Sequence, residues 1–590
     1  MSYDGIVMRA VTLELNENLQ GARIDKIFQP SKNELYLNLR QTGHTYRLLL
    51  SVLAQEAGVY LTSRPSINPT TPPHFCMLLR KHLEGGRITN VCQNSLERII
   101  EITCDVINDW GEPAQRKLII EIMGKHSNII LLDPATDRII DAIHRISPSI
   151  SRYRQVLPGL SYQTPPPQEK LIPWEVEQEV FYDKLLSYSL SQTLYKAILS
   201  SFIGLGPQTV EEIIYRSGLS SSLSIEYCGE YELNKLWLAF NQFAKAIKGG
   251  DFSPEIVFLD KKPLTFSALA LTHYSSHFRQ SFPSMNEAVD KYYNFKKETN
   301  QFQQKKNDLN QVIKKETERC EKKAGLQLNT ISEAKNSDHY RLWGELLTAN
   351  LYALKPGKEA QVNNFYTEEG QTEIIPLEEH LTVLENAQRY FNKYRKAKNA
   401  AQKAQPQYEE TLAELNYLFS LATSLENVDI LSEIEEIKDE LREAGYIKTI
   451  ISKKSKVKPS TPEATIPLKL LLDGWDIYVG RNNKQNDQLV TRISKPEDLW
   501  LHTKDIPGSH VIIKSQGNTS IPENILEKAA LLAAYHSKAR SSANVPVDYT
   551  LRKYVWKIKG AKPGMVHYES QRTIYVTPNK VIIDSLLESI

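Results

Sequence analysis

MNEAVDKYYNFKKETNQFQQKKNDLNQVIKKETERC, residues 285–320, is the stretch that decides the architecture of this chain. Its apolar side chains recur at steps of three and four residues, which keeps one narrow stripe facing a partner helix. At about 1.5 Å of rise per residue this helix would span roughly 54 Å, so we expect it to project from a globular body. The stripe consists of Tyr292, Phe295, Phe302, Leu309, Ile313 and Cys320.

A second apolar stripe, between residues 386 and 446, predicts the helix that returns. The two arms predict a long antiparallel coiled-coil hairpin over residues 276–455, with a middle insertion at about 325–384. Pro406 predicts a kink near the start of the return arm, because proline removes a helix hydrogen bond. The returning stripe contains Tyr408, Leu412, Leu415, Phe419, Leu425, Val428, Ile434, Ile437 and Leu441.

Length and composition limit the class of protein. A chain of 590 residues, 41% hydrophobic and 24% charged, is too long for one core and predicts a multidomain α+β protein of ordinary soluble composition. The opening MSYDGIVMRA predicts an amphipathic helix and not a signal peptide, and no apolar run has the length of a membrane span. Five cysteines without a CxxC pair argue against disulfides and zinc, so we expect a cytoplasmic location and no metal.

The residues before the hairpin divide into two blocks. Residues 1–165 begin with a helix over 4–19 and continue with alternating strand segments, interrupted by a helix that follows the proline-rich bend at 64–73. This pattern predicts an α+β domain whose sheet carries helices on one side. The run TPPPQ at 164–168 marks its end, and a helical domain is expected over 166–275.

Within the helical block, LSSFIGLGPQTVEEIIYRSGL (199–219) predicts a helix-hairpin-helix motif. Gly204, Gly206 and Pro207 form the turn between its two helices. Glycines permit a tight turn whose backbone N–H groups point outward, toward a phosphate at the positive end of the second helix. The alternative is a plain helical hairpin that binds nothing.

Basic residues concentrate in two runs that contain no acid, 386–405 on the return arm and 552–562 near the C-terminus. Such runs neutralise phosphates in RNA-binding proteins, but they also occur as ordinary solvated surfaces. The candidate RNA contacts are Arg389, Lys393, Arg395 and Lys396 in the first run, and Lys553 and Lys557 in the second.

The last block, residues 466–590, interleaves aromatic and basic side chains. A turn at Gly480–Asn483 suits the presentation of a cation and two amides, and a second turn lies at Pro507–Gly508. Such surfaces stack on bases and pair with phosphates, whereas the alternative is a small α+β domain with Trp475 and Trp500 in its core. No Walker loop, catalytic-triad spacing or carboxylate cluster indicates hydrolysis. The candidate RNA contacts here are Arg481, Asn482, Asn483, Trp500, His502, Lys504 and His510.

Several stretches of the chain are long composite motifs. They are VGRNNKQND (479–487), DLWLHTKDIPGSHV (498–511), GAKPGMVHY (560–568), EIMGKHSNIILLD (121–133) and NAQRYFNKYRKAK (386–398). On these motifs the chain resembles the NFACT family over essentially its whole length. The resemblance implies a fixed order of parts: NFACT-N, a helix-hairpin-helix domain, a coiled coil with a middle insertion, and an NFACT-R RNA-binding domain.

The resemblance also implies a role in ribosome-associated quality control. Members of the family bind the 50S subunit that carries a stranded peptidyl-tRNA, recruit tRNA and, in bacteria, direct non-templated alanine addition to the stalled chain. The implied partners are the 50S subunit with its 23S rRNA, tRNA-Ala, and a small RNA-binding factor of the RqcP type. Peptide-bond formation is left to the ribosome, so we expect a factor that is not an enzyme and needs no cofactor.

Carried over residue by residue, the family's tRNA-handling pair of an acid and an arginine falls on Glu97 and Arg98. The family commonly has Asp at the first position, so Glu97 keeps the charge with a longer reach. The early acidic residue of the family matches Asp4, and Lys125 lies in the motif at 121–133. Because adjacent strand residues point to opposite faces, we expect Glu97 and Arg98 to have different roles unless the turn beside them brings them together.

NFACT-N also resembles the architecture of formamidopyrimidine-type DNA glycosylases. Those enzymes need a proline followed by a glutamate at the mature N-terminus, and Met1-Ser2-Tyr3 offers neither. Glycosylase chemistry is therefore disfavoured.

A surface adhesin that binds fibronectin or fibrinogen is the second hypothesis, because the family also carries the name fibronectin-binding protein. The sequence lacks a signal peptide, a C-terminal anchor and repeats, which favours the ribosomal role and a cytoplasmic, ribosome-associated location. Secondary display at the cell surface by an unrecognised export route stays an open alternative.

Overall fold

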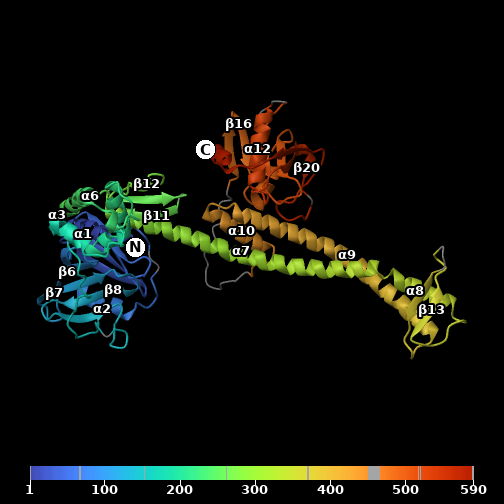
Figure 1. Cartoon of the computed structure of the whole chain (residues 1–590), viewed down its shortest axis with the longest axis horizontal. Helices are drawn as coiled ribbons and strands as arrows, with labels where there is room; N and C mark the ends of the chain where they lie inside the picture. The colour runs from blue at the N-terminus through green and yellow to red at the C-terminus, as the bar shows by residue number, and fades with distance from the viewer. Residues whose placement is uncertain are drawn as a thin grey trace. The chain divides into compact units, whose positions relative to one another are not determined.

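The computed structural model describes residues 2–65, 68–151, 153–260, 262–367, 371–448, 466–515, 517, 520–557 and 559–587. The chain forms two compact units, Met1–Asn300 and Gln301–Ile590. One long helix, α7 (Met285–Lys335), crosses from the first unit into the second (Figure 1). Among these described residues, no helix combines the length and apolar character that crossing a membrane requires. The linker expected at 453–465 lies outside the described residues.

The first unit is built on an antiparallel nine-stranded sheet in the order β4-β3-β2-β1-β5-β6-β7-β8-β9. α1 (Gly5–Leu19) packs against β4 and β5, and α2 (His74–Leu83) packs against β1, β6 and β9. The strands are β1 (Arg23–Ser31), β2 (Glu34–Gln41), β3 (His44–Ser51), β4 (Gly58–Leu61), β5 (Arg87–Gln93), β6 (Ile99–Ile107), β7 (Pro113–Glu121), β8 (Asn128–Asp133) and β9 (Arg138–Ala142).

Alternate residues of strands β6 and β7 face two different cores. Ile100 and Ile120 belong to the large cluster that contains both helices, whereas Ile99 and Ile119 join a second cluster with Val156. This part of the sheet is therefore covered on both faces, where the sequence predicted helices on one side. The second cover is the irregular chain around Val156, which has no helical periodicity to reveal it.

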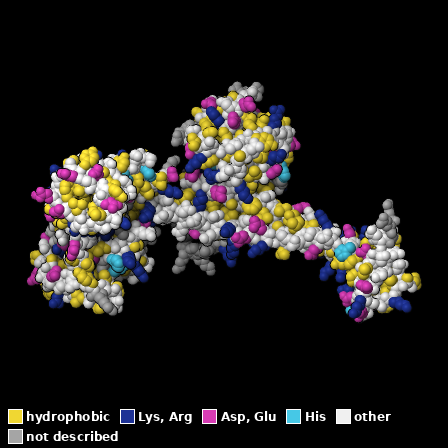
Figure 2. Space-filling model, viewed as in Figure 1, with side chains coloured by type: hydrophobic (Ala, Val, Ile, Leu, Met, Phe, Trp, Pro, Cys, Tyr) yellow, Lys and Arg dark blue, Asp and Glu magenta, His cyan; other side chains and the backbone are white. Residues whose placement is uncertain are grey.

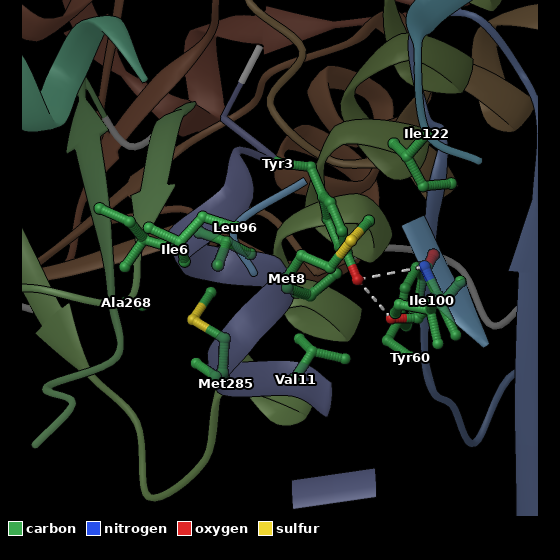
Figure 3. Packing of buried hydrophobic residues seen from close by; sticks show 14 of the residues in the cluster. Tyr3, Ile6, Met8, Val11, Tyr60, Leu96, Ile100, Ile122, Ala268 and Met285 are labelled. Carbon is green, nitrogen blue, oxygen red and sulfur yellow. Dashed lines mark hydrogen bonds between the residues drawn. The ribbon is translucent and has the colours of Figure 1, made fainter. Parts of the chain in front are cut away.

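One large core joins the N-terminus, the sheet and the start of α7. Tyr3 and Met8 lie beside Tyr60, and Met285 of α7 reaches the same cluster (Figure 3). The Tyr3 hydroxyl donates to the carbonyl oxygen of Val59 at 2.7 Å, which satisfies a buried polar group. The N-terminal residues are therefore held at the centre of the first unit.

Residues 178–281 contain helices and a small sheet. The helices are α3 (Gln178–Leu186), α4 (Leu194–Ser201), α5 (Pro207–Arg216) and α6 (Glu230–Gly249), and α4 and α5 form the predicted helical hairpin. The three-stranded sheet β11-β10-β12 follows, with strands β10 (Glu255–Leu259), β11 (Lys262–Ser267) and β12 (Phe278–Ser281). The sequence predicted only helices in this block, because strands as short as β10, β11 and β12 carry little periodic signal.

The beginning of α7 packs against this small sheet. The Tyr292 ring lies 4.7 Å from Phe266, and Phe295 lies 5.8 Å from Phe258. The prediction that these two residues begin a helix–helix seam is therefore wrong. Their rings contact strands because α7 starts inside the first unit, although only Tyr292 is buried there. The seam begins further along, near Phe302.

In the second unit, α7 runs antiparallel to α9 (Val383–Glu426), as the sequence predicted (Figure 1). Arg319 of α7 pairs with Glu414 at 3.3 Å, and Lys306 donates to the carbonyl oxygen of Glu426 at 3.0 Å. Helix α9 continues through Pro406 without interruption. Leu412, which the sequence placed in the stripe, is 39% exposed.

The return arm is two helices, where the sequence predicted one. Helix α9 ends at Glu426, and α10 (Leu431–Glu443) folds back along it, so that the Tyr417 hydroxyl donates to Glu440 at 2.7 Å. The apolar spacing continues across the turn, and periodicity alone therefore cannot reveal the reversal. The shared core includes Leu309, Ile313, Cys320, Leu415, Leu421, Leu425, Ile434, Ile437 and Leu441.

The middle insertion consists of α8 (Asp338–Ala349) and the hairpin of β13 (Glu359–Asn363) with β14 (Thr372–Pro376). Its small core joins Leu346 and Ile375 to Tyr390 at the beginning of α9. The insertion is thus anchored on the first turns of the return arm.

The C-terminal block forms a six-stranded sheet in the order β15-β16-β18-β17-β19-β22, and α12 (Glu523–Tyr535) packs on it. The strands are β15 (Leu468–Leu472), β16 (Trp475–Val479), β17 (Leu499–Thr503), β18 (Val511–Ile513), β19 (Val545–Leu551) and β22 (Arg572–Val576). Smaller elements are α11 (Asn483–Gln488), the β20 (Val555–Trp556) and β21 (His567–Tyr568) pair, and α13 (Lys580–Leu587). This is the α+β domain that the sequence predicted.

Candidate nucleic-acid interface

Asp4 joins two separate segments of the first unit, the beginnings of α1 and α5. One carboxylate oxygen caps α1 by accepting from the backbone N–H groups of Ile6 (3.1 Å) and Val7 (2.9 Å). The other accepts from the Gly206 N–H at 3.0 Å and the Thr209 hydroxyl at 3.2 Å. A single carboxylate therefore caps α1 and also binds the beginning of α5.

Glycines allow these backbones to touch. A Cβ on Gly5 would lie 2.2 Å from the carbonyl oxygen of Leu96, and one on Gly206 would lie 2.4 Å from Asp4 Oδ2. Gly204 has a φ of +80° and lies against the Leu96 side chain. We name this contact of residues 4–5, 96 and 204–206 the Asp4 junction.

The Asp4 junction corrects one expectation for the helix-hairpin-helix turn. The sequence predicted outward backbone N–H groups, but the Gly206 N–H donates to Asp4. Pro207 occupies the first turn of α5 and has no N–H to offer. The anion at this helix terminus is thus the protein's own carboxylate.

Glu97 and Arg98 line one cleft together with the Asp4 junction. The cleft has a volume of about 370 Å³ and is walled by Met123, Pro165 and Pro166. β6 begins only at Ile99, so the pair lies in the bend that follows Ser95, whose φ is +52°. This bend, which precedes the strand, brings Glu97 and Arg98 to one cleft, which is the alternative that the sequence left open for the neighbouring turn.

The charges in the cleft are desolvated. Burial raises the pKa of Asp4 and of Glu97, and for Asp4 the hydrogen bonds from Val7, Thr209 and Gly206 oppose that rise. Burial lowers the pKa of Arg98, while the nearby Asp4 charge opposes the change. In this low-dielectric setting a charged ligand would interact more strongly than on open surface.

Lys125 lies outside this cleft. It is exposed in the short 3₁₀ turn at Gly124–His126, two residues beyond Met123, which does line the cleft. The structure therefore brings Asp4, Glu97 and Arg98 together and leaves Lys125 beside them on the surface.

The basic run on α9 is partly engaged within the insertion. Arg389 pairs with Glu378, and the Lys393 ammonium lies 5.3 Å from the rings of both Tyr340 and Tyr390. Arg395 and Lys396 are exposed. Over the face shown in Figure 2, basic and acidic side chains intermingle along the helices of the second unit and do not form one large basic patch.

The Gly480–Asn483 turn is buried against α10, where the sequence expected a surface turn. Arg481 pairs with Glu433 at 2.6 Å, and the Asn482 amide donates to Glu436 at 2.7 Å. Asn483 donates to Glu440 at 3.0 Å, and the next residue, Lys484, pairs with Glu443 at 3.2 Å. We call this one-to-one row of contacts, 481–484 against Glu433, Glu436, Glu440 and Glu443, the α10 ladder.

Trp500 is a core residue, as the alternative interpretation held. It is 0% exposed and packs with Tyr568, His502 and His510 at ring distances of 4.8 to 5.8 Å. Burial lowers the pKa of His502 to about 4 and that of His510 well below its ordinary value. The expectation of a basic stacking surface is wrong for Trp500 and His510, whose rings are buried in the domain, and the half-buried His502 ring packs against both.

The remaining predicted cations lie elsewhere on this domain. Lys504 and Lys553 are exposed, and the Lys553 ammonium lies 4.9 Å from the Tyr554 ring. Lys557 pairs with Asp487 of α11.

Comparisons with known proteins agree along the whole chain. Residues 4–460 match the family described as NFACT N-terminal and middle domains, and residues 472–570 match the NFACT protein RNA binding domain. The chain belongs to the NFACT family. Its relatives include proteins named Rqc2 homolog RqcH in Bacillus subtilis (40% identical, 100% of both chains) and Streptococcus suis (37% identical, 99% of this chain and 100% of the relative).

A more distant NFACT relative and one solved structure extend the comparison. The archaeal Rqc2 homolog aRqcH of Methanocaldococcus jannaschii is 25% identical over 89% of this chain and 79% of its own length. The solved N-terminal part of the fibronectin/fibrinogen-binding protein from Streptococcus suis is 32% identical, covers 50% of this chain and 99% of its own, and superposes with a TM-score of 0.41.

Two residues in or beside the cleft at the Asp4 junction were not predicted from the sequence, Gln93 and Lys170. The Gln93 amide donates to the carbonyl oxygens of Gly5 (3.0 Å) and Glu97 (2.7 Å), and thereby fixes the bend. Lys170 lines the cleft, and its pKa is lowered by burial and then by the Arg98 charge. Lys170 follows the proline run that marked a domain boundary, so its position carried no signal of a site.

The carboxylates of the α10 ladder were also missed, although their sequence does carry a signal. Glu433, Glu436, Glu440 and Glu443 recur at steps of three, four and three, which places them on one helix face. Among the described residues of this NFACT protein, no group of three or more His, Cys, Asp or Glu side chains is arranged to hold a metal ion.

Proposed function

We propose that this protein recruits alanyl-tRNA to 50S subunits that carry a stranded peptidyl-tRNA and directs non-templated addition of alanine to the stalled chain. Membership of the NFACT family and the full-length relatives named RqcH support the coarser statement, a role in ribosome quality control. The tRNA step is the finer proposal. It is supported by the cleft at the Asp4 junction.

The observation that carries the tRNA proposal is the convergence of Glu97, Arg98 and Lys170 in one cleft of about 370 Å³. A cleft of this size suits one nucleotide and is too small for a helix, and proteins commonly recognise RNA through single unstacked nucleotides. Arginine offers a planar fork that suits a phosphate or a base edge, and a carboxylate accepts hydrogen bonds from base amino groups. We assign these roles to Arg98 and Glu97.

Asp4 has a different role in this proposal. Both of its oxygens are occupied by four donors of α1 and α5, so it holds the walls of the cleft together and is not expected to contact RNA. We therefore treat Asp4 as a positioning residue. Lys125, on the adjacent surface, is expected to attract the RNA backbone without entering the cleft.

Arg98→Ala tests the tRNA proposal. The variant should lose the tRNA that co-purifies with the protein and the alanine tails detected by mass spectrometry of stalled chains, while co-sedimentation with 50S subunits persists. Arg87→Ala removes an exposed arginine of the same sheet outside the cleft and should keep both. Normal tRNA recovery from Arg98→Ala would contradict the proposal.

Glu97→Asp separates charge from reach at the same site. Aspartate restores the residue that the family commonly has, so tRNA recovery should change little. Glu97→Gln keeps the reach without the charge, and recovery should fall if the carboxylate accepts hydrogen bonds from a base. Equal and unchanged recovery in both variants would remove Glu97 from the proposed site.

We place ribosome binding on the α9 face that carries Arg389, Lys393, Arg395 and Lys396. Two of these cations are exposed, and a helical face with cations at such spacing suits contact with an RNA backbone. Replacing Arg395 and Lys396 by Glu should weaken co-sedimentation with 50S subunits most strongly at low salt. Unchanged co-sedimentation would mean that this basic run is an ordinary solvated surface that does not bind the ribosome.

The proposed function assigns the RNA contacts to four domains along the chain. We propose NFACT-N over 1–165, the helix-hairpin-helix domain over 166–275, the coiled coil over 276–455 and NFACT-R over 466–590. In this division the tRNA cleft is made by the first two domains, and RNA contacts of the second unit belong to the last two.

A further inference from the structure

The α10 ladder occupies hydrogen-bond donors, Arg481, Asn482 and Asn483, that the sequence pattern indicated as RNA contacts. We propose that residues 481–484, which lead from the turn into the first residues of α11 and are called the 481–484 loop, form with Lys538 and Lys562 an RNA-backbone-binding surface that α9 and α10 cover with carboxylates and aromatic rings. The proposal rests on the proposed function in one respect, that this domain binds RNA. It adds which face binds, and that the chain itself competes for that face.

The donors that contact the carboxylates of α10 in the ladder are of the kinds that bind the phosphates of a nucleic-acid backbone. Four consecutive residues of the loop each meet one carboxylate of α10, through two cations and two amide donors. Steps of three and four residues place successive carboxylates about 4.5 to 6 Å apart along the helix. A row of negative oxygens at regular spacing is also what a nucleic-acid backbone presents to Lys, Arg and Asn side chains.

Two further cations of the C-terminal domain meet aromatic rings of α9 and of the turn after α10. The Lys562 ammonium lies 4.2 Å from the Tyr417 ring and 5.3 Å from Tyr446, and its Nζ donates to the Tyr446 hydroxyl at 3.0 Å. Lys538 lies 4.2 Å from the Phe419 ring. Aromatic faces and anionic oxygens together resemble the bases and phosphates of an RNA strand.

The contact has the composition of a reversible interface. Among the described residues, no cluster of buried apolar side chains includes members of both the C-terminal domain and the helices α7, α9 and α10. Glu433 is fully buried, and burial raises its pKa while Arg481 opposes the rise. Buried ion pairs stabilise little, because desolvation offsets their attraction, and polar contacts between domains commonly open.

An RNA strand can therefore exchange with α10 at little net cost. Phosphates would satisfy Arg481, Asn482, Asn483 and Lys484, so the loop loses no hydrogen-bond partner when the helix leaves. The released carboxylates of α10 would regain water. Binding of this kind depends on charge and backbone and not on base sequence, so it suits a domain that grips RNA of many sequences.

The test removes the negative charges of the ladder without changing their shape. A variant with Glu433, Glu436, Glu440 and Glu443 all replaced by Gln should bind a fluorescein-labelled single-stranded oligouridylate at least tenfold more tightly than the unmodified full chain. The plot of log affinity against log salt should steepen by about 1.4, from two newly available phosphate contacts at about 0.7 each. Adding Arg481→Ala and Lys484→Ala to this variant should abolish the gain.

A matched control changes the net charge equally. Glu409→Gln, Glu410→Gln, Glu435→Gln and Asp439→Asn neutralise four acids of α9 and α10 that lie outside the ladder. This control should leave oligouridylate affinity within about twofold, since screened surface charges act weakly at a distance. A gain equal to that of the ladder variant would overturn the proposal, because it would show a non-specific charge effect.

A milder variant guards against misfolding. Glu443→Gln changes a side chain that is 67% exposed, so the fold of α10 should tolerate it, and a gain of about twofold is expected. If neither Glu443→Gln nor the four-fold variant gains affinity while the unmodified chain binds RNA in a salt-dependent way, the covering role is wrong and the proposed function stands. If no variant binds RNA at any salt concentration, both are wrong.

Discussion

The Asp4 junction and the α10 ladder both bind a carboxylate to a turn that could otherwise meet RNA, but they differ in permanence. At the junction, three of four donors are backbone N–H groups, and glycines bring the backbones into direct contact. In the ladder, side chains contact side chains, and every donor belongs to a residue that can donate to a phosphate oxygen instead. The first carboxylate therefore builds a cleft, whereas the second row covers a surface.

The largest expected effect comes from forcing the junction apart. In Gly5→Ala the new methyl would overlap the carbonyl oxygen of Leu96, which is backbone and cannot rotate away. We expect a loss of about 3 kcal/mol or more in the stability of the first unit, measured by calorimetry, together with loss of tRNA recovery.

Gly325→Ala is the matched control for this substitution. Gly325 lies inside α7, and among the described residues no heavy atom outside its chain neighbours and the nearby helix backbone lies within 4 Å of its added methyl. Alanine there should be neutral or should stabilise by up to about 1 kcal/mol. If Gly5→Ala unfolds at the same temperature as the unmodified protein, the close packing of the junction is wrong.

The next effect compares one carboxylate from each region. Asp4→Ala removes the cap of α1 and leaves the Gly206 N–H without its acceptor, so the first unit should lose about 2 to 3 kcal/mol of stability. Glu436→Gln keeps an oxygen for Asn482 and should change the stability of the second unit by less than about 1 kcal/mol. Equal losses in denaturant unfolding would contradict the difference in permanence.

A pH dependence should follow from Glu440, whose pKa burial raises to about 7. A carboxyl with a raised pKa contributes stability that is fully present below about pH 4.5 and is lost as the pH rises through 7. The second unit should therefore weaken by about 2 kcal/mol between pH 5 and pH 8 relative to Glu440→Gln, in which this dependence is absent. The other ionisable groups that face Glu440 are Tyr417, Lys484, Asp487 and Lys562.

Thermal unfolding of both proteins across this pH range checks the assignment. The difference between them should shrink toward acid pH, because Glu440 is then protonated and resembles glutamine. A difference that grows toward acid pH would mean that Glu440 is held as a charged partner of Lys484 or Lys562. The pKa of Glu440 would then be lowered and not raised.

The sequence predicted the fold well where the apolar periodicity is strong, and poorly where contacts between distant segments determine the path of the chain. The spacing of Leu309, Ile313 and Cys320 is enough to predict a helix with a partner. The same spacing continues through Val428 to Ile434, so it could not reveal that α10 reverses. Periodicity reports which face is apolar and does not report the direction of the chain.

The candidate site divides in the same way. The family motifs indicated Asp4, Glu97 and Arg98, and the fold brings all three to one cleft. Glu97 and Arg98 reach the same cleft because Ser95 has a positive φ. A positive φ is uncommon at a residue other than glycine, so no sequence pattern predicts it here. Trp500 resembles a stacking platform in the sequence because aromatic residues suit both bases and cores, and only its burial separates the two.

Amide hydrogen exchange of the full chain, with and without single-stranded oligouridylate, tests the contrast between the two regions most directly. RNA should slow exchange at residues 481–488 and speed it in α10, because the helix leaves the loop that RNA enters. Exchange at residues 5–8 and 206–210 should stay slow, because backbone contacts hold the Asp4 junction. Faster exchange at the junction, or an unchanged α10 when RNA is bound, would contradict the account.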